Sequence, residues 1–172
     1  MNYQTKTFTL PSLQGLSEKQ IKVHLALYEG YVKNVNLILE DKTTEKFAFE
    51  FDGMRMHELY FSQFEGGATV PNENRQDLIS KIKEVAGTRG AGWVVAYFDA
   101  MAGTTHTVFV SSHEIGQLAG LPIVLVLDLW EHAFMVDYVP AEKKNYIDAF
   151  FSNLNWSVIE KRFDEAIKMS AV

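Results

Sequence analysis

The chain contains no cysteine among its 172 residues, and this absence excludes several kinds of site. Without thiols there are no disulfide bonds, no zinc sites built from thiolates and no iron–sulfur clusters. A metal site in this chain must therefore do without thiolates, and histidine nitrogens and carboxylate oxygens suit harder metals.

Long hydrophobic runs and basic clusters are missing as well. No stretch approaches the roughly 20 apolar residues that cross a bilayer. The formal net charge of -6, without a cluster of basic residues, argues against binding to nucleic acid. The polar start, Met1-Asn2-Tyr3-Gln4, lacks the apolar core of a signal peptide. We therefore expect a cytoplasmic protein that binds neither membranes nor nucleic acid.

The first half of the chain has the periodicity of two helices. Ser17-Glu18-Lys19-Gln20 has the pattern of a capping box, and the helix that it opens carries His24, Tyr28 and Tyr31 on one face. A second helix is predicted over residues 44–64, ends at Gly66-Gly67, and carries His57 among apolar residues at helical spacing. These two segments predict a helical hairpin.

The second half alternates helices with short strands. A hairpin is predicted around Ala102-Gly103-Thr104, and a third strand is expected in the same sheet. The expected helices are residues 76–85, 146–151 and 156–169, and the expected strands are residues 93–98, 105–110 and 123–127. The fold class is therefore α+β, in which an N-terminal helical hairpin precedes a small three-stranded antiparallel sheet with flanking helices. The polar turn at residues 69–75 suggests two domains, residues 1–72 and 73–172.

Asp128 and His132 form the most informative pattern in the chain. Asp128 follows the apolar run of residues 123–127, and His132 lies four residues further on. A buried carboxylate costs several kcal/mol unless it is paired or bound to a cation, so a metal is a natural partner. The same spacing also occurs by chance on many helices that bind nothing. With His24 and His57, however, the chain offers three histidines and one aspartate.

Several short motifs carry a resemblance to a known family. They are Leu10-Pro11-Ser12-Leu13, Tyr31-Val32-Lys33-Asn34, Gly90-Ala91-Gly92-Trp93, Asp128-Leu129-Trp130-Glu131-His132-Ala133 and Asn153-Leu154-Asn155-Trp156. With these motifs in this order, the chain resembles the iron/manganese superoxide dismutase family from about Leu10 to Phe163. The resemblance implies one iron or manganese ion per subunit, superoxide as the substrate, and a homodimer or a tetramer. The implied ligands are His24, His57, Asp128 and His132.

The resemblance fails at the residue that adjusts the reduction potential of the metal in this family. Iron-type members carry a glutamine four residues before the second ligand, and this chain has Gly53 there. Some members supply a histidine from the loop after the second strand, which Val110-Ser111-Ser112-His113-Glu114 resembles. By this resemblance His113 contacts the metal-bound solvent. A shift of one residue in the alignment would put Glu114 there, and His113 would be an ordinary loop residue.

Tyr31 resembles the tyrosine at the mouth of the family's active site, which can pass on a proton. In family members this tyrosine comes eight residues after the first ligand, whereas Tyr31 comes seven residues after His24. The missing residue predicts loss of a π-bulge or rotation of the helix face. An alternative alignment puts Val23 at the ligand position, but the spacing from Ser17 favours His24.

Three further residues are implied to surround the metal. Trp93 and Trp130 would wall the site and exclude bulk water, or simply pack in the core. The resemblance implies that Glu131 crosses a two-fold dimer interface to the partner subunit's metal-ligating histidine. Met135 replaces a tyrosine of the family at that interface, so the hydrogen bonds there are expected to be rebuilt.

The sequence therefore predicts a superoxide dismutase that cycles a single iron or manganese ion. Two alternatives stay open. A mononuclear metal-dependent oxygenase or hydrolase could use the same His and Asp ligands, but it would need a larger substrate pocket. A catalytically weak or metal-free structural relative of the family would keep the fold and lose the ligands first.

Overall fold

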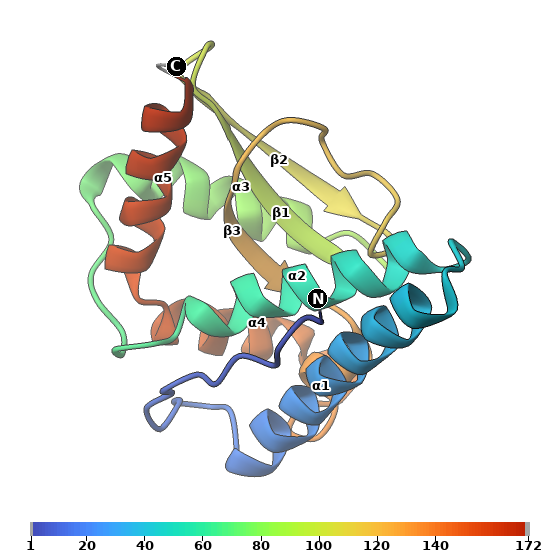
Figure 1. Ribbon diagram of the computed structural model, residues 1–172. Coiled ribbons are helices and arrows are strands. Elements are labelled where there is room, and N and C mark those ends of the chain that lie inside the picture. The colour runs from blue at the N-terminus through green and yellow to red at the C-terminus, as the bar shows by residue number, and fades with distance from the viewer. Residues whose placement is uncertain (1, 171–172) are drawn as a thin grey trace.

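The computed structural model describes residues 2–170 and has the expected α+β architecture (Figure 1). The helices are α1 (Glu18–Asp41), α2 (Phe47–Ser62), α3 (Gln76–Ala86), α4 (Lys143–Asn153) and α5 (Trp156–Ser170), and the strands are β1 (Trp93–Asp99), β2 (Thr104–Val110) and β3 (Ile123–Asp128). Short 3₁₀ helices lie at η1 (Glu73–Arg75), η2 (Glu131–Ala133) and η3 (Pro140–Glu142). Met1, Ala171 and Val172, at the ends of the two predicted domains, lie outside the described residues. No helix within residues 2–170 is long and apolar enough to cross a membrane.

The element ends differ from the sequence prediction by a few residues. Helix α2 begins at Phe47 rather than at residue 44, because Lys46 adopts a left-handed conformation with φ of 60° that a helix cannot continue through. Helix α4 is longer than expected and begins at Lys143, directly after η3. Such shifts concern helix ends, where sequence patterns are least informative.

Helix α1 begins at a cap that is only half of the predicted capping box. The Ser17 hydroxyl accepts a hydrogen bond from the backbone N–H of Gln20 at 3.1 Å, as expected. The Gln20 side chain does not return to the Ser17 N–H, however, because the carboxylate of Asp137 already accepts from that group at 2.6 Å. The Gln20 amide instead binds the backbone of His132, 112 residues later in the chain.

The sheet brings three chain segments to one end of β1. The strand order is β2-β1-β3, and both neighbours run antiparallel to β1. Trp93, the first residue of β1, pairs with Val110 on one side and with Asp128 on the other. The end of β3 and the segment that follows β2 therefore meet beside Trp93. This end of the sheet positions the site described below.

The helices cover the sheet and one of its edges. Helix α3 packs on β1 and β2 and lies behind the sheet in Figure 1, where α2 passes in front. Strand β3 is an edge strand, and buried Gln63, the residue directly after α2, pairs with it as a neighbouring strand would. The Gln63 side chain accepts from the Val126 N–H at 2.9 Å and donates to the Val126 carbonyl at 2.8 Å. This pairing fixes β3 two residues before Asp128.

Arg162 of α5 binds four acceptors, which lie on α2, on Gln63 directly after it, and on β3. Its guanidinium donates to the carbonyls of Leu59 and Val124, the hydroxyl of Ser62 and the amide oxygen of Gln63, at 2.8 to 3.3 Å. A buried carbonyl that loses its donor keeps its desolvation penalty, which is about 1–3 kcal/mol. The guanidinium thus joins α5 to the elements that carry the site.

We predict that Arg162→Met lowers the free energy of unfolding by about 1–3 kcal/mol, because the buried Val124 carbonyl loses the guanidinium donor and the Leu59 carbonyl keeps only the Ser62 hydroxyl. Urea denaturation of the wild type and the variant measures this difference. The control is the adjacent Lys161→Met, whose side chain is 76% exposed and which is expected to change stability by less than about 0.5 kcal/mol. Equal effects of the two substitutions would contradict the prediction.

Candidate metal centre

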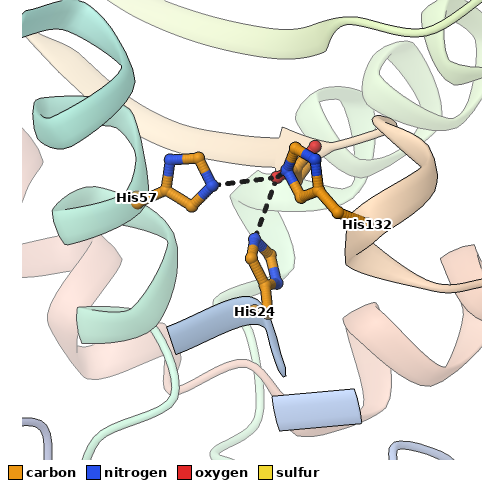
Figure 2. Close-up of side chains that lie close together, drawn as sticks. His24, His57 and His132 are labelled. Atoms are coloured by element: carbon orange, nitrogen blue, oxygen red, sulfur yellow. Dashed lines mark hydrogen bonds and ion pairs between the residues drawn. The ribbon is translucent and has the colours of Figure 1, made fainter. Parts of the chain in front are cut away.

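Three histidines and one aspartate converge between the helical hairpin and the sheet. His24 comes from α1, His57 from α2, Asp128 from the end of β3, and His132 from η2. One ligand atom from each residue lies within 4.8 Å of all the others. The Nε2 atoms of His24 and His132 are each 3.1 Å from Asp128 Oδ2, and that of His57 is 3.7 Å away. Figure 2 shows the three imidazoles pointing toward one another.

His57 presents a buried nitrogen without a hydrogen-bond partner. Its Nδ1 lies 2.7 Å from the carbonyl of Gly53, which can only accept, so the ring proton is on Nδ1. The lone pair of Nε2 then faces the cluster, and within residues 2–170 this atom has no hydrogen-bond partner. A buried lone pair without a partner is unfavourable unless it coordinates a cation. The arrangement therefore fits a bound metal ion.

The protonation states of the fully buried residues in this cluster also suit a bound metal ion. Burial lowers the pKa of both His24 and His57, so these rings stay neutral at physiological pH. Burial alone would raise the pKa of Asp128, but His132 and His24 oppose this and hold it well below its usual range. Oδ1 of the same carboxylate accepts from the backbone N–H of Trp130 at 2.8 Å. Three imidazoles and one carboxylate favour iron or manganese over metals that prefer thiolates.

His113 and Tyr31 form a hydrogen-bonded pair beside this cluster. The indole N–H of Trp93 donates to His113 Nδ1 at 2.9 Å, and an indole nitrogen can only donate. In the neutral ring the proton is therefore on Nε2, which donates to the Tyr31 hydroxyl oxygen at 2.7 Å. The hydrogen of the Tyr31 hydroxyl stays available for another acceptor.

Burial keeps both members of the pair neutral. It lowers the pKa of His113 to about 4, although the carboxylate of Asp128 opposes the shift. It also raises the pKa of the Tyr31 phenol above its usual range. A neutral His113 is also what the contact with Trp93 requires, because a protonated ring has no acceptor for the indole N–H.

The two tryptophans named by the sequence analysis lie against these rings. Trp93 is fully buried and packs edge-on to His57, with ring centroids 5.1 Å apart. Trp130 stacks on His132 and lies 5.3 Å from His113. Glu131 is exposed, next to His132 in η2. Phe49 of α2 was not predicted from the sequence, yet its ring lies 4.5 Å from that of His113 and covers the pair from the side of α2.

The comparisons with known proteins agree with this geometry. The sequence model of the C-terminal domain of iron/manganese superoxide dismutases matches residues 73–162. A protein of Aquifex aeolicus named superoxide dismutase [Fe] is 33% identical over an alignment of 192 positions. The alignment covers 91% of this chain and 88% of that protein. The chain belongs to the iron/manganese superoxide dismutase family. The resemblance read from the short motifs is thus confirmed.

Relatives of this chain carry different metals in their names. A protein of Aeropyrum pernix named superoxide dismutase [Mn/Fe] is 28% identical over an alignment of 181 positions, which covers 87% of this chain and 84% of that protein. A protein of Halobacterium salinarum named superoxide dismutase [Mn] 2 is 34% identical over 86 residues, 50% of this chain and 42% of that protein. Similarity to these proteins therefore does not choose between iron and manganese.

The shorter spacing in α1 still brings both residues to the site. Helix α1 is a continuous α-helix from Glu18 to Asp41, and seven residues make two turns, so His24 and Tyr31 share a face. Val23, which the alternative alignment puts at the ligand position, is 45% exposed, whereas His24 is fully buried. No π-bulge lies between His24 and Tyr31, as the missing residue predicts.

Gly53 leaves the space that the Tyr31 and His113 pair occupies. A Cβ atom on Gly53 would lie 2.8 Å from two ring carbons of Tyr31 and 3.2 Å from Cδ2 of His113. A glutamine at this position would therefore collide with the pair. Glu114, the alternative to His113, is exposed, and its carboxylate accepts from the hydroxyl of Ser112.

We predict that Gly53→Ala destabilises the apo-protein by about 1–3 kcal/mol, because the methyl group overpacks the rings of Tyr31 and His113. The matched control is Gly30→Ala in α1, where the added methyl group meets nothing within 4 Å. That substitution is expected to stabilise the protein by about 0.5–1 kcal/mol, since alanine favours a helix. Urea denaturation measures both, and a stabilising Gly53→Ala would contradict the packing argument.

We also predict a pH dependence that belongs to His113. Its pKa is about 4 in the folded protein and about 6.5 in an unfolded chain, so unfolding between these values takes up a proton. The stability contributed by neutral His113 is complete above about pH 6.5 and is lost as the pH falls toward 4. At pH 5, proton uptake on unfolding of apo His113→Gln should be smaller by about one. Urea denaturation at several pH values measures this slope, and an unchanged slope would contradict the assignment.

Proposed function

We propose that this protein is a superoxide dismutase, which converts superoxide to oxygen and hydrogen peroxide. The proposed ligands of a single iron or manganese ion per subunit are His24, His57, Asp128 and His132. The observation that carries the proposal is the convergence of these four buried or half-buried side chains. Nε2 of His57, which has no hydrogen-bond partner within residues 2–170, faces the other three. Membership of the superoxide dismutase family supports the same conclusion.

The bound ion would supply the one-electron chemistry, taking an electron from one superoxide and giving it to a second. The protein must then deliver two protons to the reduced oxygen. Tyr31 holds a phenol proton at physiological pH, since burial raises its pKa. The Nε2–H of His113 donates to the Tyr31 oxygen and thereby leaves the phenol proton free to point away from His113. We propose that Tyr31 and His113 are the catalytic pair that passes protons to the substrate.

Aromatic rings on several sides would keep bulk water from this pair. Trp93, Trp130 and Phe49 each lie within 6 Å of the His113 ring, measured between centroids. Exclusion of water strengthens the electrostatic effect of every polar group inside the site. We propose that these rings strengthen the electrostatic interactions within the site, in addition to packing the core.

The proposal includes a cytoplasmic homodimer. Glu131 is exposed beside His132, where it could accept a hydrogen bond from the partner's His132. Met135, Val136 and Val139 follow shortly after Glu131 in the chain, and their apolar side chains are 39 to 56% exposed. Exposed apolar side chains of this kind suit an interface between subunits, in a dimer or in a tetramer. The family's C-terminal domain begins at residue 73, which supports a division into domains at residues 1–72 and 73–172.

We predict that the protein loaded with iron or with manganese binds one ion per chain and consumes superoxide. His57→Ala should abolish stoichiometric binding and activity, because it removes one of four ligands. The matched control is His106→Ala, since His106 lies on β2 outside the cluster and its side chain is 44% exposed. Metal analysis and superoxide consumption per bound ion measure both effects.

The outcomes distinguish a dismutase from another metal-dependent enzyme and from a structural relative. Activity with one metal establishes the enzyme and its specificity, and comparable activity with both makes it cambialistic. A protein that binds one ion and consumes no superoxide contradicts the proposal and favours a different metal-dependent reaction. A wild type that binds no ion indicates a structural relative of the family.

A further inference from the structure

The site residues differ in how their backbone is held. His24, Tyr31 and His57 lie within long α-helices, where the helical hydrogen bonds fix the backbone. His132 lies in the single turn of η2, and His113 lies in a segment after β2 without regular secondary structure. These last two residues need other contacts to hold their positions.

Gln20 supplies such contacts to His132. The side chain of Gln20 is fully buried, one helical turn before His24 on α1. Its amide nitrogen donates to the His132 carbonyl at 2.6 Å, and its amide oxygen accepts from the Val136 N–H at 3.0 Å. Both ends of one amide group thus bind the backbone at and just after this ligand.

Gln117 supplies an equivalent contact to His113. Its amide nitrogen donates to the His113 carbonyl at 2.9 Å, and its amide oxygen accepts from the hydroxyl of Tyr97. Tyr97 is buried on β1, four residues after Trp93 and therefore on the same face of the strand. Strand β1 thus fixes the His113 ring through Trp93 and the His113 backbone through Tyr97 and Gln117.

We propose that Gln20 and Gln117 are positioning residues of this metal centre, which fix the backbone of His132 and His113 where helices do not. The proposal rests on the proposed function for its catalytic meaning. Each amide replaces the donor and acceptor that a neighbouring peptide group would provide. The two residues act on different parts of the site, because His132 is a proposed ligand and His113 is not.

This division predicts separate effects for two substitutions of the same size. Gln20→Leu should weaken Mn²⁺ binding by about tenfold or more, the range seen when a group that orients a metal ligand is removed. Gln117→Leu should change Mn²⁺ affinity by less than about twofold and should speed hydrogen exchange of the Trp93 indole N–H about tenfold, because His113 loses its fixed position. The matched control is Gln76→Leu at the exposed start of α3, which should change neither quantity.

The measurements are Mn²⁺ titration of the apo-protein in competition with a chelator, and NMR of the tryptophan indole protons. Tyr97→Phe gives a second test, because it should reproduce the faster Trp93 exchange without altering Gln117. Unfolding is measured for every variant, and variants are compared only where the folded state exceeds 99% of the protein. At matched folding, a merely structural role would leave both quantities unchanged.

The proposal is overturned if folded Gln20→Leu binds Mn²⁺ within twofold of the wild type, or if neither Gln117→Leu nor Tyr97→Phe speeds the Trp93 exchange. It is also overturned if Gln117→Leu weakens Mn²⁺ binding as much as Gln20→Leu does. Neither measurement uses superoxide. A protein that shows both effects and consumes no superoxide would therefore disprove the proposed function and leave the positioning roles in place.

Discussion

The structure depends on the burial of one carboxylate, that of Asp128. This group is fully buried at the end of β3, where an isolated charge would cost several kcal/mol. The surrounding elements supply what it needs, because His24 and His132 contact one oxygen and the backbone of Trp130 contacts the other. The Tyr146 hydroxyl also donates to the Asp128 carbonyl at 2.7 Å. A cation bound among these groups would offset the remaining cost.

The space beside this carboxylate depends on a glycine in α2. Gly53 removes a side chain from α2, and the rings of Tyr31 and His113 fill the place. His113 keeps a single tautomer because the Trp93 indole can only donate. Trp93, His113 and Tyr31 are thus joined by hydrogen bonds into one unit. Loss of one residue from the first helix is compatible with this unit, since seven residues keep His24 and Tyr31 on one face.

The order and type of the elements could be predicted from the sequence, because apolar spacing changes clearly from helical to alternating. The cluster of His24, His57, Asp128 and His132 was also predictable, although only the motif around Asp128 made the set convincing. The contacts of Gln20, Gln63 and Gln117 were not predictable. Each joins residues from 4 to 112 positions apart, and the partner is a backbone group, which leaves no trace in the choice of side chain. Gln20 was even assigned to a local cap, which Asp137 in fact replaces.

The sequence by itself determined which atoms are available for chemistry. The absence of cysteine and the choice of histidine and aspartate restrict the site to nitrogen and oxygen ligands, whatever the fold. Only the tertiary structure decided which of these atoms face one another and which carry protons. The His57 proton is placed by the Gly53 carbonyl, and the His113 proton by the Trp93 indole. Proton positions follow from hydrogen-bond partners, and those partners are brought together only when the helices pack on the sheet.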